Sequence, residues 1–197
     1  MLITIFTLVI LLMSVILHEL AHGYTAFMLG DSTAKYAGRL TLNPLSHLDL
    51  FGSFLVPLFL FISTGHSIGW AKPVPINPYN FKDQKNGMLK VSLAGPLSNF
   101  LVAILFGLII RFIPLNSTLI YLFSIIVFYN LLLGLFNIIP IPPLDGSHIL
   151  FSLLPEKFYG LKAFIEQYSF ILLMIFIFFG INLLFPIAIR LYTLLVG

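Results

Sequence analysis

The chain has 197 residues, of which 59% are hydrophobic and 9% charged, with a net charge of +3 and no cysteine. Soluble domains are about 25% charged, so this composition excludes a water-soluble surface and indicates an integral protein of the lipid bilayer. The excess of basic residues fits the membrane edges, where such residues set orientation, and no basic stretch interleaved with aromatic residues indicates nucleic-acid binding.

The first apolar run, residues 2–29, is long enough for a membrane-spanning helix, which needs about 20 apolar residues. No A-x-A-like cleavage site follows it, so we interpret it as a retained helix rather than a signal peptide. Residues 33–48 alternate small, polar and apolar side chains around glycine and proline, which predicts short strands and a turn. The next apolar run, residues 51–62, is short for a full span, and the sequence leaves open whether it spans or re-enters the membrane.

A polar loop rich in proline and glycine, residues 64–87, leads into two clear spans. We expect these spans at residues 88–112 and 118–138. The segment that follows, residues 137–148, contains three prolines, which predict non-helical backbone. Irregular backbone beside a span is tolerated where it is buried in protein or lines a cavity, so this segment is a candidate part of a site.

The C-terminal part of the chain holds one more span. Residues 149–154 extend the preceding element, and residues 156–167 are polar enough to lie at the membrane interface. Residues 168–185 are apolar again, and we expect Pro186 to kink this last helix. The sequence therefore predicts a single domain, residues 1–197, with an all-α polytopic membrane fold: about four spanning helices plus re-entrant β or loop elements.

Inside the first span stands the motif H-E-L-A-H, with His18, Glu19 and His22. Residues four apart share one face of a helix, so both imidazoles can bind one Zn²⁺ ion while the adjacent carboxylate acts as a general base. H-E-x-x-H also occurs by chance on ordinary helices, where its residues are solvated. That alternative is weak here, because the flanking residues leave this helix no solvated face.

A catalytic zinc typically has three protein ligands and one open position. Because cysteine is absent, the third ligand must be another histidine or a carboxylate. The candidates are Asp145, His47, His66 and His148. Asp145 precedes a glycine in P-P-L-D-G, and Asp-Gly is a common turn pair, so the residues alone leave it open between turn former and ligand.

The two motifs together, H-E-L-A-H in an early span and N-x-x-P-x-P-P-L-D-G after a later one, resemble the intramembrane site-2 metalloprotease family. Further matching stretches are GRLTLNPLSHLD, GWAKPVPINPYNF and SLAGPLSNF. The resemblance covers nearly the whole chain and is nearest to the compact bacterial-type branch without a PDZ domain. Two such motifs at this spacing on membrane segments make a highly specific signal.

The resemblance implies a site with one Zn²⁺ per chain. His18, His22 and Asp145 would be the zinc ligands, and Glu19 would be the catalytic base. Asn137, which opens the second motif, would hold the substrate peptide or stabilise the oxyanion, although asparagine is also a common helix-ending residue. Residues 33–48 would form a re-entrant β element, whose edge could receive an extended substrate by strand addition.

Three further features have simpler interpretations. Asn99 and the pair Gly95-Pro96 fit the family's middle helix, and we interpret them as close helix packing rather than as catalytic groups. His47 with Asp49 could be a second metal pair, but interfacial hydrogen bonding is the simpler reading. His148 follows the second motif closely and could hydrogen-bond to a metal ligand without contacting the metal itself.

The family resemblance implies a zinc endopeptidase that cleaves a membrane-embedded protein within or beside its transmembrane helix. Two alternatives come from other classes. A transporter of metal ions or protons would have polar residues spread along several spans, whereas here they cluster at one level. An inactive family member acting as a binding scaffold would not need the complete set of motif residues.

Topology decides whether the two motifs can meet. If residues 51–62 re-enter rather than span, one span separates the first helix from the helix leading to Asp145, and both motifs approach the same face. Eight of the ten basic residues then lie on the motif side, and Arg111 and Arg190 lie opposite. Because basic residues mark the cytoplasmic side, we expect the site to open toward the cytoplasm in a bacterial cell membrane. The oligomeric state is left open.

Overall fold

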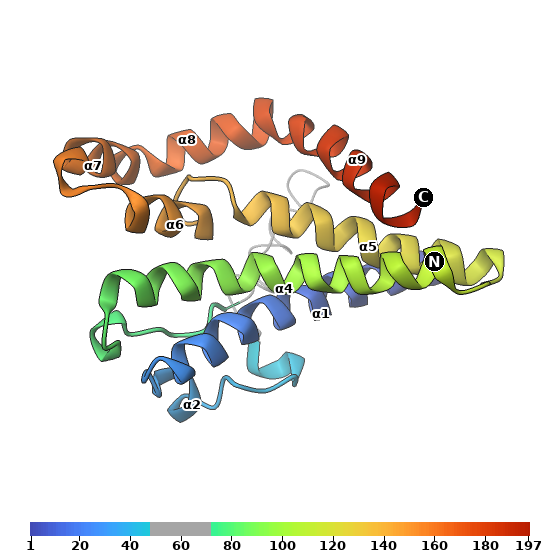
Figure 1. Cartoon of the computed structure of the whole chain (residues 1–197), viewed down its shortest axis with the longest axis horizontal. Helices are drawn as coiled ribbons and strands as arrows, with labels where there is room; N and C mark the ends of the chain where they lie inside the picture. Colours follow the sequence, from blue (N-terminus) through green and yellow to red (C-terminus); the bar gives the residue numbers. More distant parts are fainter. Residues whose placement is uncertain (48–71) are drawn as a thin grey trace.

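The computed structural model describes residues 1–47 and 72–197, and the regular structure in these two ranges is helical throughout (Figure 1). Four helices in them are long and apolar enough to cross a membrane. They are α1 (Leu2–Met28), α4 (Gln84–Phe112), α5 (Ser117–Asn137) and a C-terminal helix that runs over Ser169–Val196. The predicted all-α polytopic fold is confirmed, and the chain is a multi-pass membrane protein.

The spans alternate in direction. α1 and α5 run the same way, α4 runs antiparallel to both, and the two chain termini lie at one end of the bundle (Figure 1). α4 is central, because it packs against α1, α5, α6 (Asp145–Leu153) and α9 (Leu184–Val196). α1 ends and α4 begins at the same end of the bundle, as the arrangement with one intervening span requires. The stretch 51–62 itself lies outside the described residues.

The strand prediction is wrong for residues 33–47. They form a short helix, α2 (Thr33–Tyr36), and a 3-10 turn, Pro44–His47. The Asp31 carboxylate accepts a hydrogen bond from the Thr33 N–H at 3.1 Å and so starts the helical turn. The N–H groups of Tyr36 and Ala37 then bond to carbonyls four residues back. These two N–H groups are therefore unavailable to a partner strand, and residues 33–47 contain no strand.

The proline-rich segment is shorter than expected. α5 ends at Asn137, the backbone is irregular over residues 138–144, and helix resumes as α6 at Asp145. The expectation of non-helical backbone up to residue 148 is therefore wrong beyond Leu144. The last proline of the motif lies before the N-terminus of the new helix, where it does not interrupt any helical hydrogen bond. Asp145 occupies the first turn, where a carboxylate is favoured by the helix dipole.

The C-terminal helix changes winding part-way along. α8 (Ser169–Ile175) passes into a π-helical turn, Phe176–Gly180, and a 3-10 turn, Ile181–Leu183, before α9. The irregular turns come just before Pro186, which has no N–H to donate to the preceding turn. The change in winding lies where the kink was expected, and the helix continues beyond Pro186 to Val196. The preceding residues 156–167 form a 3-10 turn and α7 (Tyr159–Gln167), with mostly exposed side chains.

Two apolar clusters flank a polar layer along the bundle. One, Ala103, Val127, Leu131 and Ala188, joins α4, α5 and α9. The other, Ala26, Phe81 and Val91, joins the end of α1 to the start of α4. Along α4, Gly95 and Asn99 lie between Val91 of one cluster and Ala103 of the other, so the candidate site lies between the two clusters.

Candidate metal centre

Helices α1 and α4 face each other through side chains four residues apart. On α1 the buried stripe is Ser14, His18, His22 and Ala26, and on α4 it is Val91, Gly95, Asn99 and Ala103. A four-residue step returns to nearly the same face of a helix, so each stripe is a continuous seam. Antiparallel packing of the two seams sets the polar members of one helix opposite those of the other.

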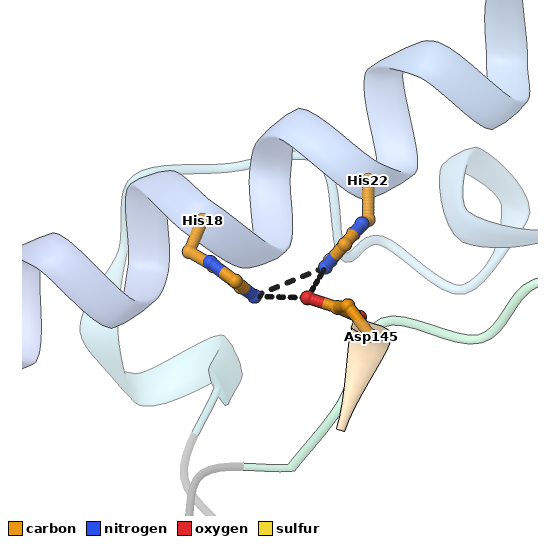
Figure 2. A group of neighbouring side chains, drawn as sticks. All are labelled: His18, His22 and Asp145. Carbon is orange, nitrogen blue, oxygen red and sulfur yellow. Dashed lines mark hydrogen bonds and ion pairs between the residues drawn. The ribbon is translucent and has the colours of Figure 1, made fainter. Parts of the chain in front are cut away.

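The two histidines point toward the carboxylate at the start of α6 (Figure 2). His18 Nε2 lies 3.0 Å and His22 Nε2 lies 3.1 Å from Asp145 Oδ2, and the two Nε2 atoms are 3.0 Å apart. Ligands of a tetrahedral ion at about 2.0–2.1 Å are about 3.3 Å from one another. The three atoms therefore form a triangle close to one face of a zinc tetrahedron, and the described residues hold no other such group of histidine and carboxylate side chains.

The hydrogen bond made by Nδ1 of His22 determines which tautomer the ring adopts. His22 Nδ1 lies 2.7 Å from the backbone carbonyl oxygen of Val91. A carbonyl oxygen can only accept a hydrogen bond, so Nδ1 carries the proton. In the neutral ring Nε2 then presents a bare lone pair toward the carboxylate.

His18 is fixed through Asn99, whose amide orientation is itself determined. Asn99 Nδ2 donates to the Ser14 carbonyl at 3.3 Å and to Asn130 Oδ1 at 3.0 Å. The Asn130 amide group in turn donates to the Ile126 carbonyl at 2.9 Å. Asn99 Oδ1 is therefore the acceptor for His18 Nδ1, at 2.8 Å, and His18 Nε2 also faces the triangle as a lone pair.

When both rings are neutral, two imidazole lone pairs and a carboxylate oxygen face one another and repel. A bound cation would remove this repulsion. Gly95 supplies the space. A Cβ atom at this position would lie 2.4 Å from His22 Nε2 and 2.6 Å from His18 Cε1. The residues present thus fit a bound Zn²⁺ in donor type, spacing and room.

Glu19 lies on the neighbouring face of α1 and is held by a different contact. Its Oε2 accepts a hydrogen bond from the Val74 N–H at 2.7 Å. The described residues give the other carboxylate oxygen no hydrogen-bond partner, so it is the one available to a reacting group.

The remaining sequence candidates lie outside this cluster or outside the described chain. Asn137 ends α5 and donates to the Leu133 carbonyl at 3.0 Å, so its role toward a substrate stays a prediction. His148 is exposed on α6. His47 is fully buried and its Nε2 lies 2.8 Å from the Thr41 carbonyl, in line with structural hydrogen bonding. Asp49 and His66 fall among the residues that are not described.

The sequence predicted α4 and α5 as spans but not the part that their buried polar side chains play around the cluster. Asn99 was expected to serve helix packing, yet it orients a histidine of the cluster. Asn130 and Ser14 were not anticipated, although a fully buried asparagine in an apolar span is by itself a pointer to function. The small size of Gly95 is explained by the two imidazole rings that it faces, which no local pattern reveals.

Comparison with known proteins agrees with this geometry. Residues 113–183 match the model of peptidase family M50. YwhC of Bacillus subtilis, provisionally named a zinc metalloprotease, is 40% identical over 174 residues, which are 84% of this chain and 76% of that protein. The chain belongs to peptidase family M50, the site-2 protease family.

Two more distant relatives carry similar names. The zinc metalloprotease MJ0392 of Methanocaldococcus jannaschii is 29% identical over 79% of this chain and 36% of its own length. Rip2 of Mycolicibacterium smegmatis, provisionally named a zinc metalloprotease, is 30% identical over 83% of this chain and 63% of its own length. No solved structure matches the chain. The family and these names support a site-2 protease-like metalloprotease, and they imply zinc as its metal.

Gly95→Ala tests the space for the ion. The added methyl group would stand against both imidazoles, so we expect zinc affinity to fall by at least about 10-fold, as it does when a partner of a ligand is lost. The measurement is metal analysis of the purified protein. Gly107→Ala is the matched control on the same helix, since its Cβ would meet Leu195 instead, at 2.9 Å. Normal zinc in Gly95→Ala would contradict the placement of the ion.

Asp145→Ala tests the third ligand. Removing the carboxylate leaves two nitrogens, and we expect zinc affinity to fall by more than the about 10- to 100-fold that loss of an outer partner causes. Zinc titration against a competing chelator measures it. His148→Ala, on the same helix but exposed, should bind zinc like the wild type. If His148→Ala loses the metal and Asp145→Ala keeps it, the assignment is wrong.

Proposed function

We propose that this chain is an intramembrane zinc endopeptidase that cleaves a membrane protein substrate within or beside its transmembrane segment. The observation that carries the proposal is the triangle of His18, His22 and Asp145 inside the spans. Its two histidine lone pairs and carboxylate oxygen lie 3.0–3.1 Å apart. Membership of the site-2 protease family supports the same reading.

Each motif residue has one task in this proposal. His18, His22 and Asp145 would hold Zn²⁺, which when bound supplies Lewis acidity that polarises the scissile carbonyl and activates water. Glu19 would accept the proton of the attacking water and pass it to the leaving amine. Asn137, at the end of α5 beside the irregular segment 138–144, would hold the substrate peptide.

The layered arrangement favours this function over the alternatives. A transporter would need polar groups along a path through the membrane, whereas Ser14, His18, His22, Asn99 and Asn130 form one connected group of side chains. An inactive scaffold would not require hydrogen bonds that fix the tautomers of both histidines. Within the proposal, the substrate must present an unwound peptide bond to this layer, and residues 33–47 do not supply the strand edge that the sequence suggested.

We further propose that the site opens toward the cytoplasm of a bacterial cell. α1, α4 and α5 are arranged so that the ends of α1 and α5 approach the same face (Figure 1). The basic residues near that face exceed those on the opposite side, where Arg111 and Arg190 lie on α4 and α9. The excess of lysine and arginine marks the cytoplasmic side.

Glu19→Gln separates catalysis from metal binding. The amide keeps the shape of the side chain but cannot take a proton, so we expect proteolysis to fall about 10²- to 10⁴-fold with zinc content unchanged. Purified protein is incubated with a panel of single-span membrane proteins, with and without a zinc chelator, and scored for cleavage and for metal. Loss of zinc in Glu19→Gln would show that the residue is structural or is itself a ligand.

Orientation is tested by single-cysteine labelling, for which the cysteine-free chain is a ready background. Gln84→Cys and Gly160→Cys change exposed positions on the proposed cytoplasmic side, and Ser117→Cys changes an exposed position on the other side. In intact cells an impermeant thiol reagent should label position 117 and leave 84 and 160 unlabelled until the cells are opened. The reverse pattern would overturn the proposed orientation.

A further inference from the structure

An extended segment, residues 72–77, crosses beside the candidate catalytic glutamate, and we name it the strap. Its Val74 is 5% exposed, and a Cβ atom on Gly23 of α1 would come within 2.9 Å of the Val74 side chain. Pro73 and Pro75 have no N–H group, so Val74 provides the donor at the middle of the strap. That donor is the one that binds Glu19, at 2.7 Å.

A buried arginine holds the beginning of the strap. Arg39 is 8% exposed, and its guanidinium donates to the carbonyl of Lys72 at 2.7 Å and to that of Pro73 at 3.2 Å. It also donates to the carbonyl of Ser46. Among the described residues no carboxylate pairs with it. Burying a charge is costly unless it is compensated, and here carbonyl oxygens from two segments supply the compensation.

A buried aspartate holds the other end. Asp31 is fully buried, and its Oδ2 accepts the Asn77 N–H at 2.7 Å while its Oδ1 accepts the Asn80 amide at 2.7 Å. Burial raises the pKa of Asp31, but the hydrogen bonds from Thr33, Asn77 and Asn80 outweigh it and hold the pKa below its usual range. The carboxylate therefore stays ionised, and the strap is held by a cation on the carbonyls of Lys72 and Pro73 and by an anion on the Asn77 N–H.

These contacts form one connected path. We propose that Arg39 is a positioning residue for Glu19: it fixes Lys72 and Pro73, and thereby places the Val74 N–H that orients the glutamate carboxylate. One oxygen of Glu19 is held by the strap, which leaves the other to face the reacting water. The inference rests on the proposed function, in which Glu19 is the base, and it adds a residue that lies in neither metal-binding motif.

The test compares Arg39→Gln and Arg39→Lys with the wild type on a single-span substrate that the wild type cleaves. A misplaced base lowers the rate of the chemical step, so we expect kcat to fall about 10- to 100-fold in Arg39→Gln with KM and zinc content unchanged. Arg39→Lys, which can still donate to carbonyls, should fall less. Arg111→Gln is the control, because the exposed Arg111 also donates to a backbone carbonyl, that of Leu194 at 2.9 Å.

A second pair of variants examines the hydrogen bond itself. Val74→Pro removes the N–H, whereas Val74→Ala keeps it and shortens the side chain. We expect Val74→Pro to lose kcat as Arg39→Gln does, and Val74→Ala to retain most of it. If both changes act through one contact, the double variant Arg39→Gln/Val74→Pro should be no slower than Val74→Pro alone.

The inference would be overturned by normal kcat in Arg39→Gln while Glu19→Gln is inactive. Loss of zinc together with activity in Arg39→Gln would also overturn it. So would a double variant whose loss of kcat equals the product of the two single losses. Faster cleavage by Arg39→Gln would also overturn the inference, because the strap would then obstruct access of the substrate to the site instead of positioning Glu19. Hydrogen exchange of peptides covering residues 72–77 needs no substrate, and Arg39→Gln should raise it. Absence of cleavage by the wild type would refute the proposed function, whereas unchanged exchange in Arg39→Gln would refute the positioning role separately.

Discussion

The structure depends on the way two antiparallel membrane helices satisfy the outer nitrogens of two histidines. His18 binds the Asn99 amide and His22 binds the Val91 carbonyl, both on α4. In lipid an unsatisfied polar group is expensive, so these bonds fix the register of α1 against α4. They also set the tautomer of each ring. The same contacts that allow the histidines to be buried therefore make them ready to bind a metal ion.

Helix α4 contributes three features to the site besides the motif residues. Val91 offers its carbonyl, Gly95 offers room, and Asn99 offers an amide oxygen, at successive steps of four residues. Asn99 is itself held by Asn130 on α5. A network of this kind is stable only when each member is satisfied, which places three spans in one fixed arrangement around the cluster.

The proposed base, Glu19, belongs to a second set of contacts, which the metal-binding motifs do not contain. Glu19 is tied to the strap, and the strap is tied to Arg39 and Asp31 outside the spans. Catalytic groups must be held within a fraction of an ångström of their working geometry. In this protein the proposed metal ligands are positioned by the packing of the spans, whereas Glu19 is bound by a segment that lies outside them. The two can therefore be changed independently by mutation.

The sequence by itself determined what depends on local spacing. Composition fixed the membrane class, run length located the spans, and the i, i+4 step set His18 and His22 on one face of a helix. The resemblance named the family and pointed to Asp145. Where the sequence pattern misled, a short-range hydrogen bond or the start of a new helix decided the outcome. Asp31 started a helical turn where strands were expected, and helix resumed at Asp145 directly after the prolines.

Only the tertiary structure decided which groups surround the cluster. The partner of His18 is 81 positions away in the chain, and the N–H that binds Glu19 is 55 positions away. Such pairs depend on how helices pack and on which backbone atoms remain unpaired, and neither is encoded in the spacing of neighbouring residues. The sequence could therefore propose the ligands and the base, whereas the fold alone showed what holds them in place.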